Sequence, residues 1–319
     1  AMAYLIAASA ILLTASSYGI MARVYPVAGS AYTYARRSLS SGTGFLVGWA
    51  VLLDYFFLPM VIWLIGAAYL SSAFPAVPAW LWIVGFIVST TIVNLVGIAF
   101  ANRVNVVLML VQLAVLVAFV ALAARYVVSI NGTGGLTSVR PFFDASVPVG
   151  ASLAGAAIAA YSFLGFDAVS TLTEETRNPT RTMPRAIMII AVIGGLIFTG
   201  SAYVTQLAHP GGEFASVDSA ASEIALMIGG DLFVTVFLAT LVVAQFTSGL
   251  AAQASVGRLL FAMGRDGVLP AAIFGKLHRK WRTPVFNLVI VGMVGLLALT
   301  LDVTTSTSFV NFGAFLAFT

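Results

Sequence analysis

The sequence predicts an all-α polytopic membrane protein, on the basis of its composition and the lengths of its apolar stretches. Of the 319 residues, 61% are hydrophobic and only 8% are charged, and the mean hydropathy is +1.05. This balance excludes a soluble domain with a large core. Apolar stretches of about 20 residues recur along the whole chain, and that length crosses a bilayer as a helix.

The apolar spans and the loops between them predict a topology. We place the spans at 2–22, 44–71, 79–101, 104–126, 149–174, 186–207, 232–262 and 285–301, with an incomplete one from about 307 to the end. Basic residues gather in alternate loops, at Arg23, Arg36, Arg37, Arg103, Arg177, Arg181, Arg185 and over 265–282. Because cytoplasmic loops carry the excess of Lys and Arg, these loops are predicted to face the cytoplasm of a cell whose plasma membrane holds the protein.

Both ends of the chain lie in apolar sequence. The orientation above starts the first span outside the cell, yet no basic leader or cleavage site precedes it. The last segment, FVNFGAFLAFT, is too short to cross a bilayer. We therefore expect a fragment of a longer membrane protein.

Several kinds of chemistry find no support in the sequence. Cysteine is absent, and His209 and His278 both fall in predicted loops without metal-ligand spacing. No cluster of nucleophile, base or metal ligands is present, so we expect neither an enzyme nor a bound metal or cofactor. The net charge of +4 comes from basic residues in short loops rather than from one patch, which argues against nucleic acid as a partner.

The span 149–174 is interrupted near its middle by Gly165 and Asp167. An interrupted helix inside a bilayer persists only where protein or an aqueous cavity surrounds it, and an ionisable residue there usually faces a substrate or ion path. A half-helix that ends near Ser162 would present carbonyl groups and a negative dipole end to an ammonium group. We therefore predict a substrate site at this break.

Three aromatic side chains adjoin the break. Tyr161, Phe163 and Phe166 are candidates for walls that hold a cation through cation–π contacts. The alternative is that each aromatic side chain only packs between helices, as small residues such as Gly150 and Gly155 do.

Asp54 is a second carboxylate inside a span, with Tyr55 next to it and no basic residue in the same helix. It must face a cavity, hydrogen-bond to neighbours or be protonated. Asp54 and Tyr55 are therefore candidates for binding a cationic substrate, and Asp54 is also a candidate for carrying a coupling proton. The alternative is a protonated acid that only bonds a neighbouring helix.

The loop after the break is rich in charge. Glu174 and Glu175 lie close in sequence to Arg177 and Arg181, at the predicted cytoplasmic face. These four residues are candidates for an inner gate that opens and closes by exchanging salt bridges. The alternative is a solvated loop that only fixes the orientation of the protein.

Four segments of the sequence resemble the amino acid–polyamine–organocation (APC) permeases. They are SYGIMARVYPVAGSAYTYARR at 17–37, GWAVLLDYFFLP at 48–59, FLGFDAVSTLTEETRNPTRTMPRAI at 163–187 and RLLFAMGRDGVLP at 258–270. Within the superfamily, Asp54 and the run at 163–187, which would lie in the third and sixth helices of the family fold, look most like those of bacterial putrescine importers. Cationic amino acid permeases are next in similarity.

The resemblance implies a LeuT-like fold of two inverted five-helix repeats in a bacterial inner membrane. The chain would then be a single transporter domain over 1–319 that runs from the second helix of the fold into the tenth. Its first repeat, 1–126, would lack its first helix, and its second repeat, 149–319, would be incomplete at its end. The resemblance also implies that the stretch around Gly165 binds substrate amines and that Asp54 matches an acid of the cationic permeases.

Gln112 departs from the family pattern. Some proton-coupled relatives place a lysine near this position, where its ammonium group substitutes for a sodium ion. Gln112 stands there in this chain, and both lysines, Lys276 and Lys280, fall in one loop. Gln112 remains a coupling candidate, with an interhelical hydrogen bond as the alternative.

These observations together predict a secondary transporter that imports a small organic cation by alternating access with coupling to protons. Putrescine or a related diamine is the expected substrate, because Asp54 and Asp167 match two ammonium groups. The alternatives are a cationic or neutral amino acid permease and, more remotely, a membrane partner subunit that does not itself transport. A channel would need a continuous polar path, which isolated residues do not supply. The expected partners are the small-molecule substrate, membrane lipid and protons.

Overall fold

The computed structural model describes residues 1–96, 101–144, 147–211, 213–215 and 219–319. This described part is helical throughout, without strands. Its long helices are α1 (Met2–Val24), α3 (Ser41–Ala73), α4 (Ala79–Val96), α5 (Ala101–Asn131), α6 (Val149–Ala159), α7 (Pro179–Ala208), α8 (Ala220–Arg265), α10 (Val285–Gly295) and α11 (Val303–Phe318). Shorter helices are α2 (Ser30–Ser38), α9 (Ala271–Phe274) and the 3₁₀ segments η1 (Thr133–Thr137), η2 (Ala160–Phe163), η3 (Ala168–Glu175) and η5 (Leu296–Leu299).

The predicted spans correspond to these helices, and the differences lie at their ends. Seven helical segments of the described part are long and apolar enough to cross a membrane. The second span begins at Ser41 rather than at 44, because the side chain of Ser40 accepts a hydrogen bond from the Thr43 amide and caps the helix. The last begins at Val303 rather than near 307, because Asp302 caps it in the same way. Residues 97–100, at the end of the predicted third span, and the side chain of Arg103 lie outside the described part.

Two further differences come from backbone geometry. Helix α8 starts well before the predicted span 232–262, and Gly230, with φ of 71°, kinks it. The predicted span 285–301 is divided into α10 and the 3₁₀ segment η5. The short helix α2 has no counterpart among the predicted spans, since its apolar stretch is far too short to cross a bilayer.

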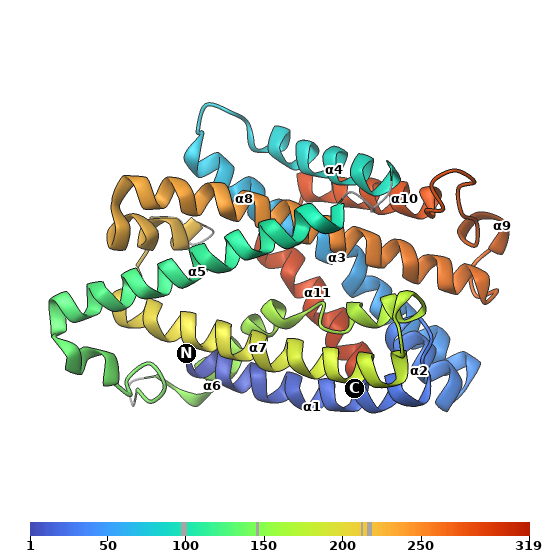
Figure 1. Cartoon of the computed structure of the whole chain (residues 1–319), viewed down its shortest axis with the longest axis horizontal. Helices are drawn as coiled ribbons and strands as arrows, with labels where there is room; N and C mark the ends of the chain where they lie inside the picture. The colour runs from blue at the N-terminus through green and yellow to red at the C-terminus, as the bar shows by residue number, and fades with distance from the viewer. Residues whose placement is uncertain (97–100, 145–146, 212, 216–218) are drawn as a thin grey trace.

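Helix α3 is the centre of the bundle. It packs against α2, α4, α8, α10 and α11, and its Trp63 and Tyr55 side chains are fully buried. A Cβ at Gly313 of α11 would lie 2.6 Å from the amide nitrogen of Asp54, so the absence of a side chain there lets α11 approach α3 closely. Helices α1, α6 and α7 form a neighbouring group (Figure 1).

The interrupted segment lies between these two groups of helices. Its η2 half contacts α1, α7 and α11, while its η3 half contacts α2, α7 and α8. Figure 1 shows it between α7 and α3, away from the outer helices α4 and α5.

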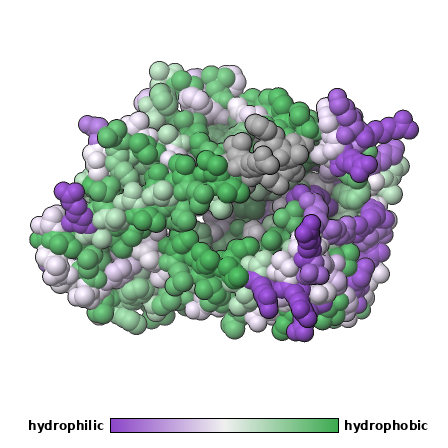
Figure 2. Space-filling view, viewed as in Figure 1, coloured by the Kyte–Doolittle hydropathy of each residue, from purple (hydrophilic) through white to green (hydrophobic). Residues whose placement is uncertain are grey.

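The surface matches a membrane environment. Figure 2 shows apolar residues over the middle of the visible face and hydrophilic residues gathered mainly at one end, where Figure 1 places α2 and α9. Helix α5 exposes large apolar side chains such as Val107, Leu110 and Val117. Such a face is stable against lipid and would be unusual in water.

Candidate functional site

The interruption predicted at Gly165 and Asp167 is present in the structure. Helix α6 ends at Ala159, η2 ends at Phe163, and helical structure resumes with η3 at Ala168. Gly165 has φ of 96°, a conformation that other residues rarely adopt. The glycine therefore allows the chain to leave one half-helix and enter the next.

Asp167 is fully buried at this break, with an exposed fraction of 0%. Its Oδ2 accepts a hydrogen bond of 2.7 Å from Ser30 Oγ and one of 2.8 Å from the hydroxyl of Tyr55. Its Oδ1 is buried without a hydrogen-bond partner among the described residues. Asp167 thus keeps one oxygen free for a further donor.

Asp54 is also buried, with an exposed fraction of 1%. Its side chain makes no hydrogen bond within the described part of the chain, and its Oδ1 is buried without a partner there. Asp54 and Asp167 lie close enough to interact electrostatically. No Lys, Arg or His of the described residues forms an ion pair with either of them.

Two neighbouring carboxylates without a basic partner are unfavourable in a membrane interior unless something neutralises them. A bound cation or a proton would supply the positive charge that the described side chains do not. The arrangement is therefore suited to binding an organic cation, a proton or both.

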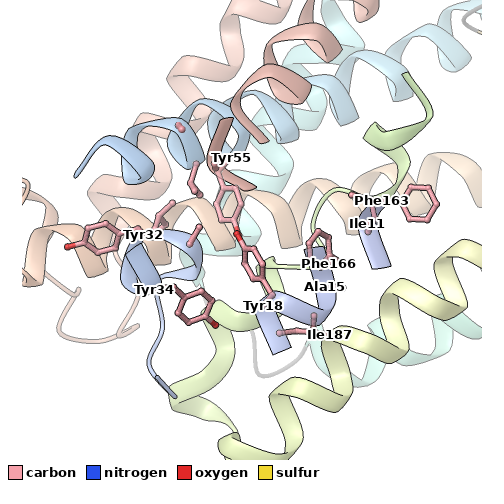
Figure 3. Packing of buried hydrophobic residues seen from close by; sticks show 14 of the residues in the cluster. Ile11, Ala15, Tyr18, Tyr32, Tyr34, Tyr55, Phe163, Phe166 and Ile187 are labelled. Atoms are coloured by element: carbon pink, nitrogen blue, oxygen red, sulfur yellow. The ribbon is translucent and has the colours of Figure 1, made fainter. Parts of the chain in front are cut away.

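An aromatic cluster lies beside Asp167. The ring of Tyr18 makes edge-to-face contacts with those of Tyr34, Phe166 and Phe318, with centroids 5.5 to 5.6 Å apart. Figure 3 shows the ring of Tyr18 between those of Tyr34 and Phe166, with the hydroxyl ends of Tyr18 and Tyr55 directed at each other. Phe166 is therefore a packing residue in this conformation.

A cavity of about 460 Å³ opens between α3, the broken segment, α7 and α8. Of the eight predicted substrate residues, it is lined by Tyr55, Tyr161, Ser162 and Gly165. Polar side chains of α8 that the sequence did not suggest also line it, namely Gln245, Ser248 and Ser255. These three residues lie on one face of the helix, so their spacing in the sequence could have indicated a polar face that lines a cavity.

The other four predicted substrate residues do not line this cavity. Phe163 packs edge-to-face on Phe198 of α7, because apolar helices surround η2 on that side. Asp54, Phe166 and Asp167 are buried behind the lining, although Asp54 is close enough to Tyr161 to interact electrostatically and Asp167 is bonded to Tyr55. Asp167 is thus one side chain away from the cavity.

At the predicted cytoplasmic end of the break, the structure pairs the predicted gate acids with α8. Glu174 lies 3.1 Å from Arg265, and Glu175 lies 3.2 Å from Arg258. In the described part of the chain, neither acid forms an ion pair with Arg177 or Arg181. The η3 segment contacts both α7 and α8, and the two acids take their partners from α8.

These four paired residues line a second cavity of about 340 Å³. The pairs join the broken segment to α8 in the lining of this cavity. All four side chains are partly exposed, so each pair contributes little stability and is easily exchanged.

A further charged contact joins α2 to the end of α8. Arg36 lies 3.2 Å from Asp266, and the hydroxyl of Tyr32 accepts a hydrogen bond from Arg36 while donating one of 3.1 Å to Asp266. Burial raises the pKa of Tyr32, so that its hydroxyl keeps the proton that it donates. The sequence contains the two motifs to which these residues belong, at 17–37 and 258–270, but nothing in it indicates that the two motifs are in contact.

Gln112 of α5 contacts α8. Its Nε2 donates a hydrogen bond of 3.4 Å to Thr247 of α8. This contact corresponds to the interhelical hydrogen bond that the sequence left open as the alternative to coupling.

Comparison with known proteins agrees with this architecture. The model of the amino acid permease family matches residues 1–319. The chain is 41% identical over 318 residues to the low-affinity putrescine importer PlaP of Escherichia coli, covering 99% of this chain and 70% of that protein. It is 28% identical to the branched-chain amino acid permease BcaP of Bacillus subtilis, with the same coverage of both chains.

A plant relative has similar identity. The vacuolar cationic amino acid transporter 4 of Arabidopsis thaliana is 29% identical over 342 residues, which cover 100% of this chain and 55% of that protein. All these relatives are transport proteins. The match over the whole chain, the broken helix and the apolar spans show that this multi-pass membrane protein belongs to the amino acid permease family, within the APC superfamily.

Proposed function

We propose that this protein imports putrescine or a related diamine across a bacterial inner membrane by alternating access. The observation that carries the proposal is the pair of buried carboxylates, Asp54 and Asp167, each with an Oδ1 that has no partner among the described residues. A diamine brings two ammonium groups, each able to donate three hydrogen bonds. One ammonium group at each carboxylate would neutralise both buried charges.

The relationship to PlaP supports the same substrate class. Identity of 41% extends over nearly the whole chain rather than over one motif. The aromatic side chains of Tyr55 and Tyr161, at the cavity between the broken segment and α8, suit a cation with an apolar methylene chain. The absence of catalytic chemistry in the sequence fits transport without an enzymatic step.

Proton coupling is part of the proposal, with Asp54 as the carboxylate that takes up the proton. When no ammonium group is bound, a proton on Asp54 would remove the uncompensated charge of a buried acid. Asp54 is suited to this role because none of the described residues hydrogen-bonds to it.

We also propose that the pairs Glu174–Arg265 and Glu175–Arg258 form the cytoplasmic gate. They bridge the broken segment and α8, which are the elements that also line the substrate cavity. Breaking these pairs would allow the two elements to separate on the cytoplasmic side.

An amino acid permease is the second candidate. The relatives BcaP and cationic amino acid transporter 4 favour it, since both are named as amino acid transporters. An amino acid would bring one α-ammonium group and a carboxylate, which would require a hydrogen-bond donor site besides Asp54 and Asp167.

Competition for uptake separates the two candidates. The protein at its natural full length is reconstituted in proteoliposomes, and labelled putrescine uptake is measured against unlabelled diamines, arginine, lysine and leucine, with and without a proton gradient. The diamine proposal predicts inhibition by diamines alone. Inhibition by the amino acids, or no putrescine uptake, would reject it and favour the amino acid permease.

A further inference from the structure

The loop between α1 and α2 reaches the interior of the protein at Ser30. Ser30 is fully buried, and its Oγ donates the 2.7 Å hydrogen bond to Asp167 Oδ2 across 137 residues of sequence. Tyr55 donates to the same oxygen. The two donors therefore fix the orientation of the carboxylate and leave Oδ1 as the free acceptor.

The backbone at Ser30 is unusual. Its φ is 51°, a left-handed value that is uncommon for residues other than glycine, and the preceding Gly29 has φ of 127°. A Cβ at Gly29 would lie 2.0 Å from Thr33 Oγ1, so this turn requires glycine. Such a conformation persists where the surrounding contacts determine it, and the bond to Asp167 is one such contact.

The same short helix is anchored at the cytoplasmic face. Helix α2 begins at Ser30 and carries Tyr32 and Arg36, which both bond to Asp266 just after α8. Helix α2 also packs against α3 so closely that a Cβ at Gly44 of α3 would lie 2.7 Å from the Cα of Arg36. Helix α2 and the turn before it thus connect the buried Asp167 with the contact between Arg36 and Asp266 on the proposed cytoplasmic side.

We propose that Ser30 is a positioning residue that orients Asp167 for the substrate cation and couples that orientation, through α2, to the Arg36–Asp266 contact. The first half of this inference rests on the proposed function, because it treats Asp167 as a substrate carboxylate. The second half concerns contacts between described residues and does not depend on the substrate.

The coupling is tested by a double-mutant cycle. Its readout is the labelling rate of an introduced cysteine, which reports how accessible the cavity on the proposed cytoplasmic side is. The chain contains no cysteine, so Ala254→Cys, in the lining of the cytoplasmic cavity, is a unique reporter within it. The rate of maleimide labelling is measured without substrate in the native background and with Ser30→Ala, Asp266→Asn and both together. Loss of the hydrogen bond to Asp167 in Ser30→Ala, or of the charge that pairs with Arg36 in Asp266→Asn, is expected to speed labelling about fivefold.

If α2 couples the two contacts, the double variant is labelled no faster than either single variant. Rates that multiply to about 25-fold, or single variants that leave the rate unchanged, would overturn the coupling. Ser30→Gly repeats the test with a residue that tolerates the positive φ, in case Ser30→Ala does not fold. Ser38→Ala is the control, because Ser38 is an exposed serine of α2 whose hydroxyl bonds only within its own helix.

The positioning role is tested by transport kinetics in the same variants. Ser30→Ala is expected to raise the KM for putrescine about fivefold while kcat stays within about twofold, whereas Ser38→Ala changes neither. An unchanged KM in Ser30→Ala would overturn the positioning role. No putrescine uptake by the native protein would instead reject the proposed function, and the labelling cycle would still decide whether α2 couples the two contacts.

Discussion

Tyr55 of α3 donates a hydrogen bond of 2.8 Å to Asp167 in the broken segment, and thereby joins the centre of the bundle to the helix break. Tyr55 also lines the cavity beside that break. The carboxylate behind it is thus connected to the cavity through one side chain.

Removing the Tyr55 hydroxyl should weaken substrate binding without removing the aromatic wall. Tyr55→Phe is expected to raise the KM for putrescine about threefold to tenfold, since one donor to the buried carboxylate is lost. Tyr161→Phe is the matched control, because Tyr161 lines the same cavity and its hydroxyl makes no hydrogen bond to either carboxylate. Equal effects of the two substitutions would contradict a specific role for the Tyr55–Asp167 bond.

Neutralising Asp167 should have a larger effect. Asp167→Asn keeps an acceptor for Ser30 and Tyr55 but removes the charge that would bind an ammonium group, so uptake at low substrate concentration should fall at least about tenfold. The measurement is initial uptake rate normalised to protein in the liposomes. Asp231→Asn, which removes an exposed carboxylate at the start of the long part of α8, should leave the rate unchanged. Uptake near the native rate in Asp167→Asn would show that this carboxylate does not bind the substrate.

Asp54 and Gln112 were both coupling candidates, and substitution distinguishes them. Asp54→Asn is expected to abolish the stimulation of uptake by an imposed proton gradient, because the amide cannot exchange a proton near neutral pH. Gln112→Leu should keep that stimulation, since Gln112 makes an interhelical bond to Thr247. Loss of stimulation in Gln112→Leu, with retention in Asp54→Asn, would reverse the assignment.

The gate pairs predict a charge-swap result. Arg265→Glu should disturb transport by placing two acids together, and Glu174→Arg in the same protein should restore uptake at least in part, because the pair at 3.1 Å is re-formed with opposite polarity. Arg177→Glu is the control, as Arg177 forms no ion pair with either acid in the described part of the chain. A double variant no better than Arg265→Glu alone would count against a gate at this position.

The sequence predicted the elements that depend on local signals. Span lengths follow from hydrophobicity, and the break followed from Gly165 and Asp167 inside one apolar stretch. Membership of the APC superfamily was also confirmed, because its motifs are spread along the whole chain. These features need no knowledge of which residues meet across the fold.

Contacts between distant segments were not predictable from a single sequence. The sequence places Glu174 and Glu175 near Arg177 and Arg181 as gate candidates, and the structure pairs the two acids with Arg265 and Arg258 of α8. These partners belong to a helix that is far from the acids in sequence but contacts η3 in the fold. For the same reason, Ser30 carried no signal of its contact with Asp167.

The central claim is that two carboxylates bind the two ammonium groups of a diamine. The most direct measurement compares the affinities of putrescine and n-butylamine, which lacks the second amine, for the full-length protein and for Asp54→Asn and Asp167→Asn. The claim predicts that the native protein binds putrescine at least about tenfold more tightly than butylamine and that this preference is lost in both single variants. Equal affinities in the native protein, or a preference that survives both substitutions, would contradict it.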